Sequence, residues 1–102
     1  MVKQYDYLIV GAGLYGAAFA YRARQRGKSS LVVGRRPHPG GNLYCEEIEG
    51  IRVHKYGPHI FHTADREVWD FVRTLTEFNR FTYMPLANYE GRIFNLPFNM
   101  NT

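Results

Sequence analysis

The sequence predicts an α/β fold built on a parallel sheet, and its first third carries that prediction. An apolar run over residues 5–10 is followed by a glycine-rich turn, a helical stretch and a second apolar run over 29–33. Short continuous apolar runs are typical of strands in a parallel sheet, because both faces of such a sheet are covered. A strand, a helix and a strand within about 30 residues predict a right-handed parallel crossover.

The elements of this crossover can be placed in order. The helix is expected over residues 14–25, where several alanines favour helical backbone and are small enough to pack closely on a sheet. Gly27 is placed to end the helix in a left-handed cap. After the second strand, residues 34–42 are rich in glycine and proline and predict a loop.

Three more elements are expected beyond this loop: a small hairpin, a helix and a second hairpin. Asp65 is a typical N-cap, and an apolar stripe follows it. Four aromatic residues are expected in the core of this part: Trp69, Phe71, Phe78 and Phe81. The predicted ranges are 43–47 paired with 51–54, the helix 66–76, and 81–89 paired with 92–96.

The size of the chain limits what it can form alone. Its 102 residues fit at most one small domain. Two parallel strands with one crossover helix cannot cover both faces of a sheet. Asn101 and Thr102 are typical of a helix N-cap. We therefore expect the natural polypeptide to continue past Thr102.

Composition narrows the class of protein. The apolar fraction of 45% and the charged fraction of 22% are those of a globular protein rather than a disordered one. No apolar run approaches the ~20 residues that cross a bilayer, and the N-terminus leads directly into a strand, so neither membrane insertion nor a signal peptide is expected. The single cysteine, Cys45, excludes an internal disulfide and is expected to be a half-buried strand residue. These features predict a cytoplasmic protein.

Neither the basic residues nor the histidines indicate a further ligand class. The net charge is +4, but no nucleic-acid motif accompanies it, and the arginines after residue 21 fall at a helix end, where cations are favoured. Nucleic-acid binding is therefore not expected. His59 and His62 have no carboxylate or thiolate placed to complete a tetrahedral set, so no metal site is expected either.

The glycines between the first strand and the helix form the motif that indicates a bound ligand. Gly11 allows a sharp turn out of the strand, Gly13 lets a pyrophosphate approach the backbone, and Gly16 lets the helix and strand pack closely. The first amides of the helix then point at the phosphates, and the helix dipole favours their charge. This motif, in this context, predicts a partial Rossmann-like FAD/NAD(P)-binding fold.

The end of the second strand departs from this pattern. An acidic residue is expected there to hold the ribose hydroxyls, but this chain has Gly34. Arg35 and Arg36 follow, and arginines near this point can accept a 2′-phosphate. Spacing alone therefore leaves both FAD and NADP open.

Longer stretches of the sequence resemble the UDP-galactopyranose mutase family. They are YDYLIVGAGLYGA, RRPHPGGNLYCE, HKYGPHIFHT, EFNRFTYMPLA and FNLPFNMNT, in the order that the family has them. The resemblance favours FAD over NADP. It implies an isomerase that interconverts UDP-galactopyranose and UDP-galactofuranose with reduced FAD and no net oxidation. It also implies a homo-oligomer that serves cell-surface polysaccharide biosynthesis.

The same resemblance implies a set of site residues. The pyrophosphate would be surrounded by Gly11, Gly13, Leu14, Tyr15 and Gly16, and the adenosine ribose would lie at Gly34 and Arg35. A second glycine turn would be lined by Gly40, Gly41 and Asn42. His59 and Ile60 would lie beside the isoalloxazine with His62 behind, so that the two histidines are the catalytic candidates. Tyr83 stands where the family has an asparagine associated with the nucleotide substrate.

The resemblance sets the expected organisation and leaves alternatives. Residues 1–102 would be the N-terminal part of an FAD-binding domain, with the helical substrate domain and the last flavin-binding strand outside this sequence. The segment alone would then be inactive. Two other readings stay open: a segment of an NAD(P)- or FAD-binding oxidoreductase, and a non-catalytic nucleotide-binding remnant.

Overall fold

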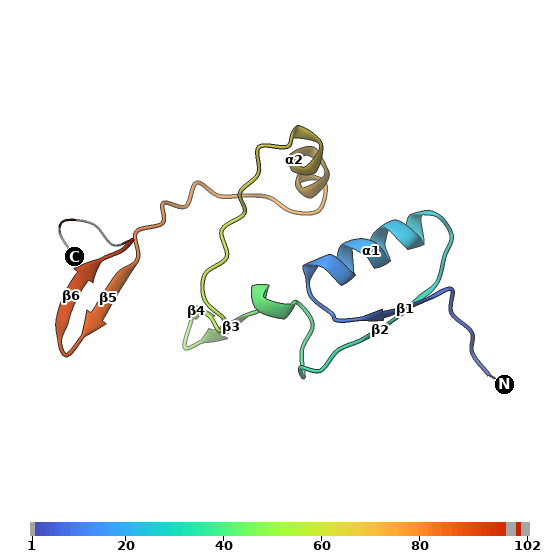
Figure 1. Ribbon diagram of the computed structural model, residues 1–102, viewed down its shortest axis with the longest axis horizontal. Coiled ribbons are helices and arrows are strands. Elements are labelled where there is room, and N and C mark those ends of the chain that lie inside the picture. The colour runs from blue at the N-terminus through green and yellow to red at the C-terminus, as the bar shows by residue number, and fades with distance from the viewer. Residues whose placement is uncertain (1, 98–99, 101–102) are drawn as a thin grey trace. The chain divides into compact units, whose positions relative to one another are not determined.

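The computed structural model describes residues 2–97 and Met100 (Figure 1). The chain divides into two compact units, Met1–Phe61 and His62–Thr102, and each is described here by itself. The helix N-cap expected at Asn101 and Thr102 lies outside the described residues.

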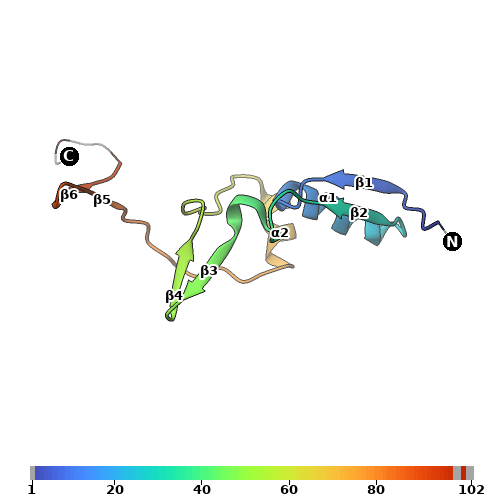
Figure 2. The ribbon, with the colours of Figure 1, turned by 90° about the horizontal axis from the view of Figure 1, so that it is seen from below.

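The first unit contains the expected strand–helix–strand crossover. Strand β1 (Tyr7–Val10) pairs in parallel with β2 (Ser30–Val33), and Leu8 lies opposite Leu31. Figure 2 shows the two arrows pointing the same way. Helix α1 (Leu14–Gln25) connects them and contacts both strands. The prediction of an α/β fold with a parallel crossover is confirmed.

Helix α1 ends as the sequence predicts. Gly27 has a φ of +72°, in the left-handed region that favours glycine. Its N–H donates to the carbonyl of Arg24, and the Lys28 N–H donates to the carbonyl of Ala23, each at 3.0 Å. This pair of bonds is a Schellman motif, which satisfies carbonyls that the last turn of the helix leaves free.

The starts of the two parallel strands are tied together by one aspartate. Asp6 Oδ2 accepts hydrogen bonds from the backbone N–H of Ser29 at 2.8 Å and from its hydroxyl at 3.1 Å. The Ser29 hydroxyl oxygen in turn accepts from the Asp6 N–H at 3.1 Å. The backbone bond from Ser29 is the main cause that lowers the pKa of the Asp6 carboxyl, with the Ser29 hydroxyl and the charge of Lys28 adding to it.

This link predicts a pH dependence of stability. Because folding lowers the pKa of Asp6, its contribution is fully present above the pKa of the unfolded chain, about 4, and is lost as the pH falls through the lower pKa of the folded state. Asp6→Asn should therefore reduce the free energy of unfolding at pH 7 and change it less below pH ~3. Urea denaturation at both pH values measures this, and an equal loss at both would contradict the role of the ionised carboxylate.

The rest of the first unit is a short 3-10 turn and a hairpin. The turn spans Gly41–Leu43, so the predicted loop over 34–42 is wrong at its last two residues. Strands β3 (Cys45–Ile48) and β4 (Ile51–His54) pair antiparallel, as predicted. The turn between them places Glu49 at φ 53° and Gly50 at φ 79°, which fits a tight two-residue hairpin loop. Cys45 is half-buried in its strand, as predicted.

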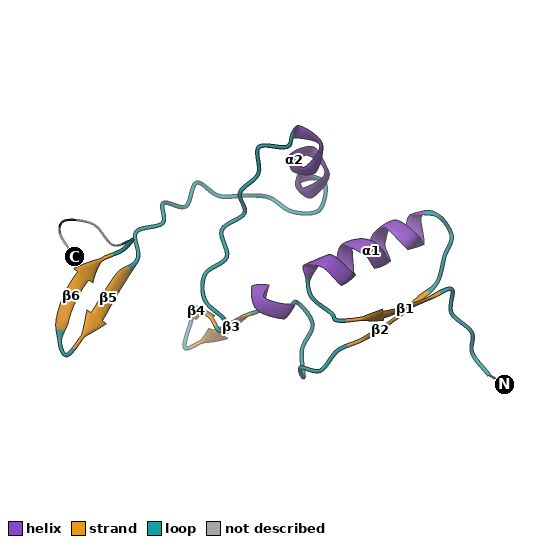
Figure 3. Cartoon of the chain, viewed as in Figure 1, coloured by secondary structure: helices purple, strands orange, loops and turns teal. Residues whose placement is uncertain are grey.

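The second unit contains one helix and one hairpin. Helix α2 (Arg66–Arg73) begins at the predicted cap, where Asp65 Oδ1 accepts from the N–H groups of Glu67 and Val68 at 2.9 and 3.1 Å. It ends at Arg73 rather than at residue 76, because the chain turns at Thr74. Figure 3 shows the stretches before and after α2 as loop.

The second hairpin is shorter than predicted. Strands β5 (Leu86–Tyr89) and β6 (Arg92–Asn95) pair antiparallel around the expected turn at 90–91. The strand predicted to start at residue 81 instead starts at Leu86. Pairing stops near Pro85 and Pro97, which have no N–H to extend the ladder. Phe81, placed in the core from sequence, is 67% exposed because it lies before the paired segment.

Burial in the described chain is sparse. Among the described residues, Ala23 is the only apolar side chain that is buried, and Gly16 is buried beside the strands. Leu8 and Val10 of β1 are 65% and 81% exposed. Strands of a parallel sheet are normally covered on both faces, so most of the apolar surface of β1 is available for further packing.

Candidate functional site

The glycine-rich turn has the geometry that its sequence demands. Gly11 has a φ of +115°, and its N–H donates to the carbonyl of Val33 at 2.8 Å, which ties the turn to the end of β2. A Cβ on Gly16 would collide with the carbonyl oxygen of Gly11 and lie 3.1 Å from Ile9 Cγ2. Gly16 is thus the residue that lets α1 approach β1, as predicted.

The start of α1 presents backbone N–H groups that make no hydrogen bond within the helix and are free to donate to an anion. The first helical bond of the turn runs from the Ala17 N–H to the Gly13 carbonyl at 3.0 Å, so the N–H groups of Leu14, Tyr15 and Gly16 have no partner within the helix. Gly13 has no side chain with which to cap them. The first turn contains no acidic residue, so nothing opposes the partial positive charge of the helix start.

The second glycine turn packs directly on the first. The Gly40 N–H donates to the carbonyl of Ala12 at 2.8 Å. A Cβ on Gly41 would lie 2.9 Å from the Gly13 Cα, and Gly41 has a φ of +58°. Only glycine fits this backbone contact without a shift. The structure therefore brings together two glycine turns that the sequence analysis associated only through a family resemblance.

The end of β2 lies beside the same turn. A Cβ on Gly34 would lie 3.4 Å from the Ala12 Cβ, which places this residue next to the glycine loop. Gly34 and Arg35 are both exposed. Arg36 differs, because its Nη1 donates to Asn42 Oδ1 at 2.9 Å and its guanidinium lies 3.9 Å from the centre of the Tyr56 ring. Of the two arginines considered for a 2′-phosphate, Arg36 already has other partners.

Comparison with known proteins decides the family. The family of NAD(P)-binding Rossmann-like domains matches residues 9–75, which include the glycine loop, α1 and the second glycine turn. The chain belongs to this family. The Rossmann-like fold predicted from the glycine spacing is confirmed, and the two glycine turns just described lie within the matched residues.

Curated relatives of this Rossmann-like domain include sugar-nucleotide mutases. The chain is 42% identical over 97 residues to a dTDP-fucopyranose mutase of Escherichia coli, and 37% identical over 97 residues to a probable UDP-galactopyranose mutase of Klebsiella pneumoniae; each match covers 93% of this chain. It is 34% identical over 102 residues, or 97% of the chain, to the UDP-galactopyranose mutase of Mycoplasma pneumoniae. The resemblance to UDP-galactopyranose mutase is confirmed. The chain spans about a quarter of the length of these relatives, at 26%, 25% and 26% respectively.

The remaining predicted site residues of the Rossmann-like domain lie away from the two turns in sequence. His59 and Ile60 close the first unit; both are exposed, and His59 Nδ1 lies 2.9 Å from the Gly57 carbonyl, to which it donates. His62 and Tyr83 belong to the second unit and are exposed there. The roles of these four residues stay predictions.

Sequence reasoning missed a cluster beside the second glycine turn. The His38 ring is stacked on Tyr44, with centroids 3.6 Å apart and planes at 9°, and its Nε2 lies 2.8 Å from the Tyr56 hydroxyl. The His38 side chain is half-buried. No spacing signal could reveal this contact, because 18 residues separate His38 from Tyr56 and the hairpin between them brings the two together.

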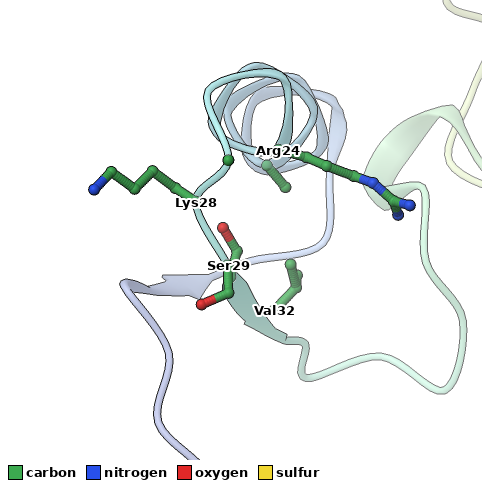
Figure 4. A pocket seen from close by; sticks show the side chains of 7 residues that line it. Arg24, Lys28, Ser29 and Val32 are labelled. Atoms are coloured by element: carbon green, nitrogen blue, oxygen red, sulfur yellow. The ribbon is translucent and has the colours of Figure 1, made fainter.

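One hollow of the described chain lies away from the glycine loop. It measures about 540 Å³ and lies at the opposite end of α1, between the helix end and β2 (Figure 4). The side chains of Arg24 and Lys28 extend from it in opposite directions, so they do not converge on one anion. A helix C-terminus also carries partial negative charge, which disfavours phosphate. This hollow therefore lacks the converging positive charge that a phosphate group needs.

Neither a metal site nor a membrane-spanning helix is found within residues 2–97 and Met100. There, no group of three or more histidine, cysteine, aspartate or glutamate side chains is arranged to hold a metal ion. Over the same part of the chain, neither helix has the length and apolar character that crossing a membrane requires.

Proposed function

We propose that this chain is the FAD-binding segment of a flavin-dependent sugar-nucleotide mutase. The observation that carries the proposal is the backbone contact between Gly13 and Gly41 beside the free amides of α1. The Rossmann-like family match and the mutases among the relatives support it. A pyrophosphate needs close backbone approach, N–H donors and partial positive charge, and this turn supplies all three.

The residues present fit FAD in a specific way. The N–H groups of Leu14, Tyr15 and Gly16 would donate to the pyrophosphate, and the turn at Gly40, Gly41 and Asn42 would close over it. Gly34 and Arg35 would lie at the adenosine ribose, with no carboxylate at the end of β2 to accept from its hydroxyls. FAD rather than NADP is favoured because Arg36 already contacts Asn42 and Tyr56. When bound and reduced, FAD supplies the nucleophile that allows a sugar ring to open and reclose without net oxidation.

The substrate proposed from the sequence is UDP-galactopyranose, interconverted with UDP-galactofuranose. Tyr83 would face the nucleotide sugar, and His59, Ile60 and His62 would lie along the flavin. A second candidate is dTDP-fucopyranose, because the relative named for that sugar is 42% identical and the one named for UDP-galactopyranose is 37% identical. Both candidates are nucleoside diphosphate sugars and require the same cofactor segment.

The chemistry of the whole enzyme requires more than this chain. The match covers about a quarter of each relative, and the exposed apolar surface of β1 fits packing against further segments. We infer that residues 1–102 alone are inactive as a mutase. We also infer that the whole protein is a cytoplasmic homo-oligomer that serves galactofuranose and cell-surface polysaccharide biosynthesis.

Calorimetric titration of the 1–102 chain tests the cofactor. FAD should bind saturably, ADP should compete with it, and NADP should bind more weakly than FAD. Tighter binding of NADP than of FAD would overturn the flavin assignment, and no binding of either would overturn a functional site on this chain.

A chimera tests the mutase assignment itself. This chain would replace the matching N-terminal residues of the Klebsiella pneumoniae relative, and ring interconversion of UDP-galactopyranose would be assayed after the flavin is reduced. Activity is expected, together with bound FAD. A chimera that holds FAD but interconverts neither UDP-galactopyranose nor dTDP-fucopyranose would contradict the proposal.

A further inference from the structure

The second glycine turn is held at both ends by one cluster of side chains. His38 precedes the turn and stacks on Tyr44, which follows it. Arg36 also precedes the turn, and its Nη1 donates at 2.9 Å to Asn42, which lies within it. Each of these two contacts therefore spans Gly40 and Gly41.

Tyr56 joins these two contacts. Its hydroxyl lies 2.8 Å from His38 Nε2, and the guanidinium of Arg36 lies over its ring at 3.9 Å. Tyr56 follows β4, so it is placed by the hairpin rather than by the loop that it contacts. A single residue outside the loop thus touches both side chains that span the turn.

Hydrogen-bond chemistry fixes how Tyr56 and His38 interact. His38 Nδ1 lies 3.0 Å from the Pro39 carbonyl, which can only accept, so Nδ1 carries the proton. In the neutral ring Nε2 is then an acceptor, and it accepts from the Tyr56 O–H. The Pro39 carbonyl therefore fixes the tautomer of His38, and the Tyr56 hydroxyl holds the orientation of its ring.

The turn needs this support. Gly40 and Gly41 have φ values of +102° and +58°, and glycine loses more conformational freedom on ordering than any other residue. The backbone contact that ties Gly40 to the first glycine loop is the bond from its N–H to the Ala12 carbonyl. Ordering the turn before a ligand arrives lowers the entropy cost of binding.

We propose that Tyr56 is a positioning residue for the cofactor. Tyr56 acts through His38 and Arg36 to hold the Gly40–Gly41 turn against the glycine loop. Its hydroxyl orders the turn and does not itself touch the dinucleotide. This inference rests on the proposed function for its effect on FAD, but its effect on the turn can be measured without any ligand.

Tyr56→Phe tests the inference, because it removes the hydroxyl and keeps the ring under Arg36. In the full 1–102 chain, amide hydrogen exchange of Gly40 should accelerate about fivefold, the effect of losing one ordinary hydrogen bond, and the Kd for FAD should rise by a similar factor. The Lys28 amide, bonded to Ala23 at the far end of α1, is the internal reference and should not change. Tyr44→Phe is the matched control, since its ring rather than its hydroxyl makes the contact with His38.

The outcomes distinguish the positioning role of Tyr56 from the proposed FAD-binding function. Unchanged exchange at Gly40, or equal acceleration at Gly40 and Lys28, would overturn the positioning role. If the unaltered chain binds no FAD, the proposed function fails, and the Gly40 exchange rate still decides whether Tyr56 orders the turn.

Discussion

Gly34→Glu is expected to tighten FAD binding by the 1–102 chain about ten- to a hundredfold. A carboxylate at the end of β2 would accept hydrogen bonds from the adenosine ribose, and a bond to a charged group contributes about 1.5–3 kcal/mol. The backbone tolerates the change, because Gly34 does not have a positive φ and its Cβ would lie 3.4 Å from the Ala12 Cβ. Calorimetric titration of both chains with FAD measures the gain.

Matched ligands and variants isolate the cause of that gain. ADP contains the ribose and should tighten by the same factor, while FMN lacks the adenosine and should not. NADP should weaken, because the new carboxylate repels a 2′-phosphate. Gly34→Ala changes the backbone in the same way without the charge. An equal gain with alanine would show that chain stiffening, and not the carboxylate, is responsible.

Gly16→Ala is expected to destabilise the first unit by about 3 kcal/mol, at the upper end of the usual cost of overpacking. The added Cβ would collide with the carbonyl oxygen of Gly11. It would also lie 3.1 Å from Ile9 Cγ2. The oxygen belongs to the backbone, so α1 itself must move away from β1. Urea denaturation followed by circular dichroism measures the loss.

Gly13→Ala serves as the control for that variant. Its Cβ would have only the Gly41 Cα within 4 Å, at 3.8 Å, so stability should change by less than about 1 kcal/mol. The methyl group would nevertheless stand where the pyrophosphate approaches, and FAD binding should weaken. If Gly16→Ala were as stable as the unaltered chain, the close helix–strand contact would not be needed.

Elements whose hydrogen bonds close within a few residues could be predicted from the sequence. Gly27 ends α1 through bonds to Ala23 and Arg24, and Asp65 caps α2 through the next two or three amides. The turn at Glu49 and Gly50 set the first hairpin in the same local way. For such elements the residues that decide the structure are neighbours in the chain, so their spacing is sufficient.

The first glycine turn could be predicted for the same reason, but the packing of the second glycine turn on it could not. Gly11 and Gly16 belong to one strand–turn–helix unit, and their spacing indicates where this unit has no room for a side chain. The length of β5, by contrast, depended on how far β6 could pair with it, and Phe81 was left exposed as a result.

By itself, then, the sequence determined the crossover, the first glycine turn and the family. Only the tertiary structure showed that Gly41 packs on Gly13, and that Tyr56 holds His38 and Arg36 beside them. The physical reason is that these contacts join residues far apart in the chain. Their geometry depends on the path of the intervening loop and hairpin, which no local pattern of residues specifies.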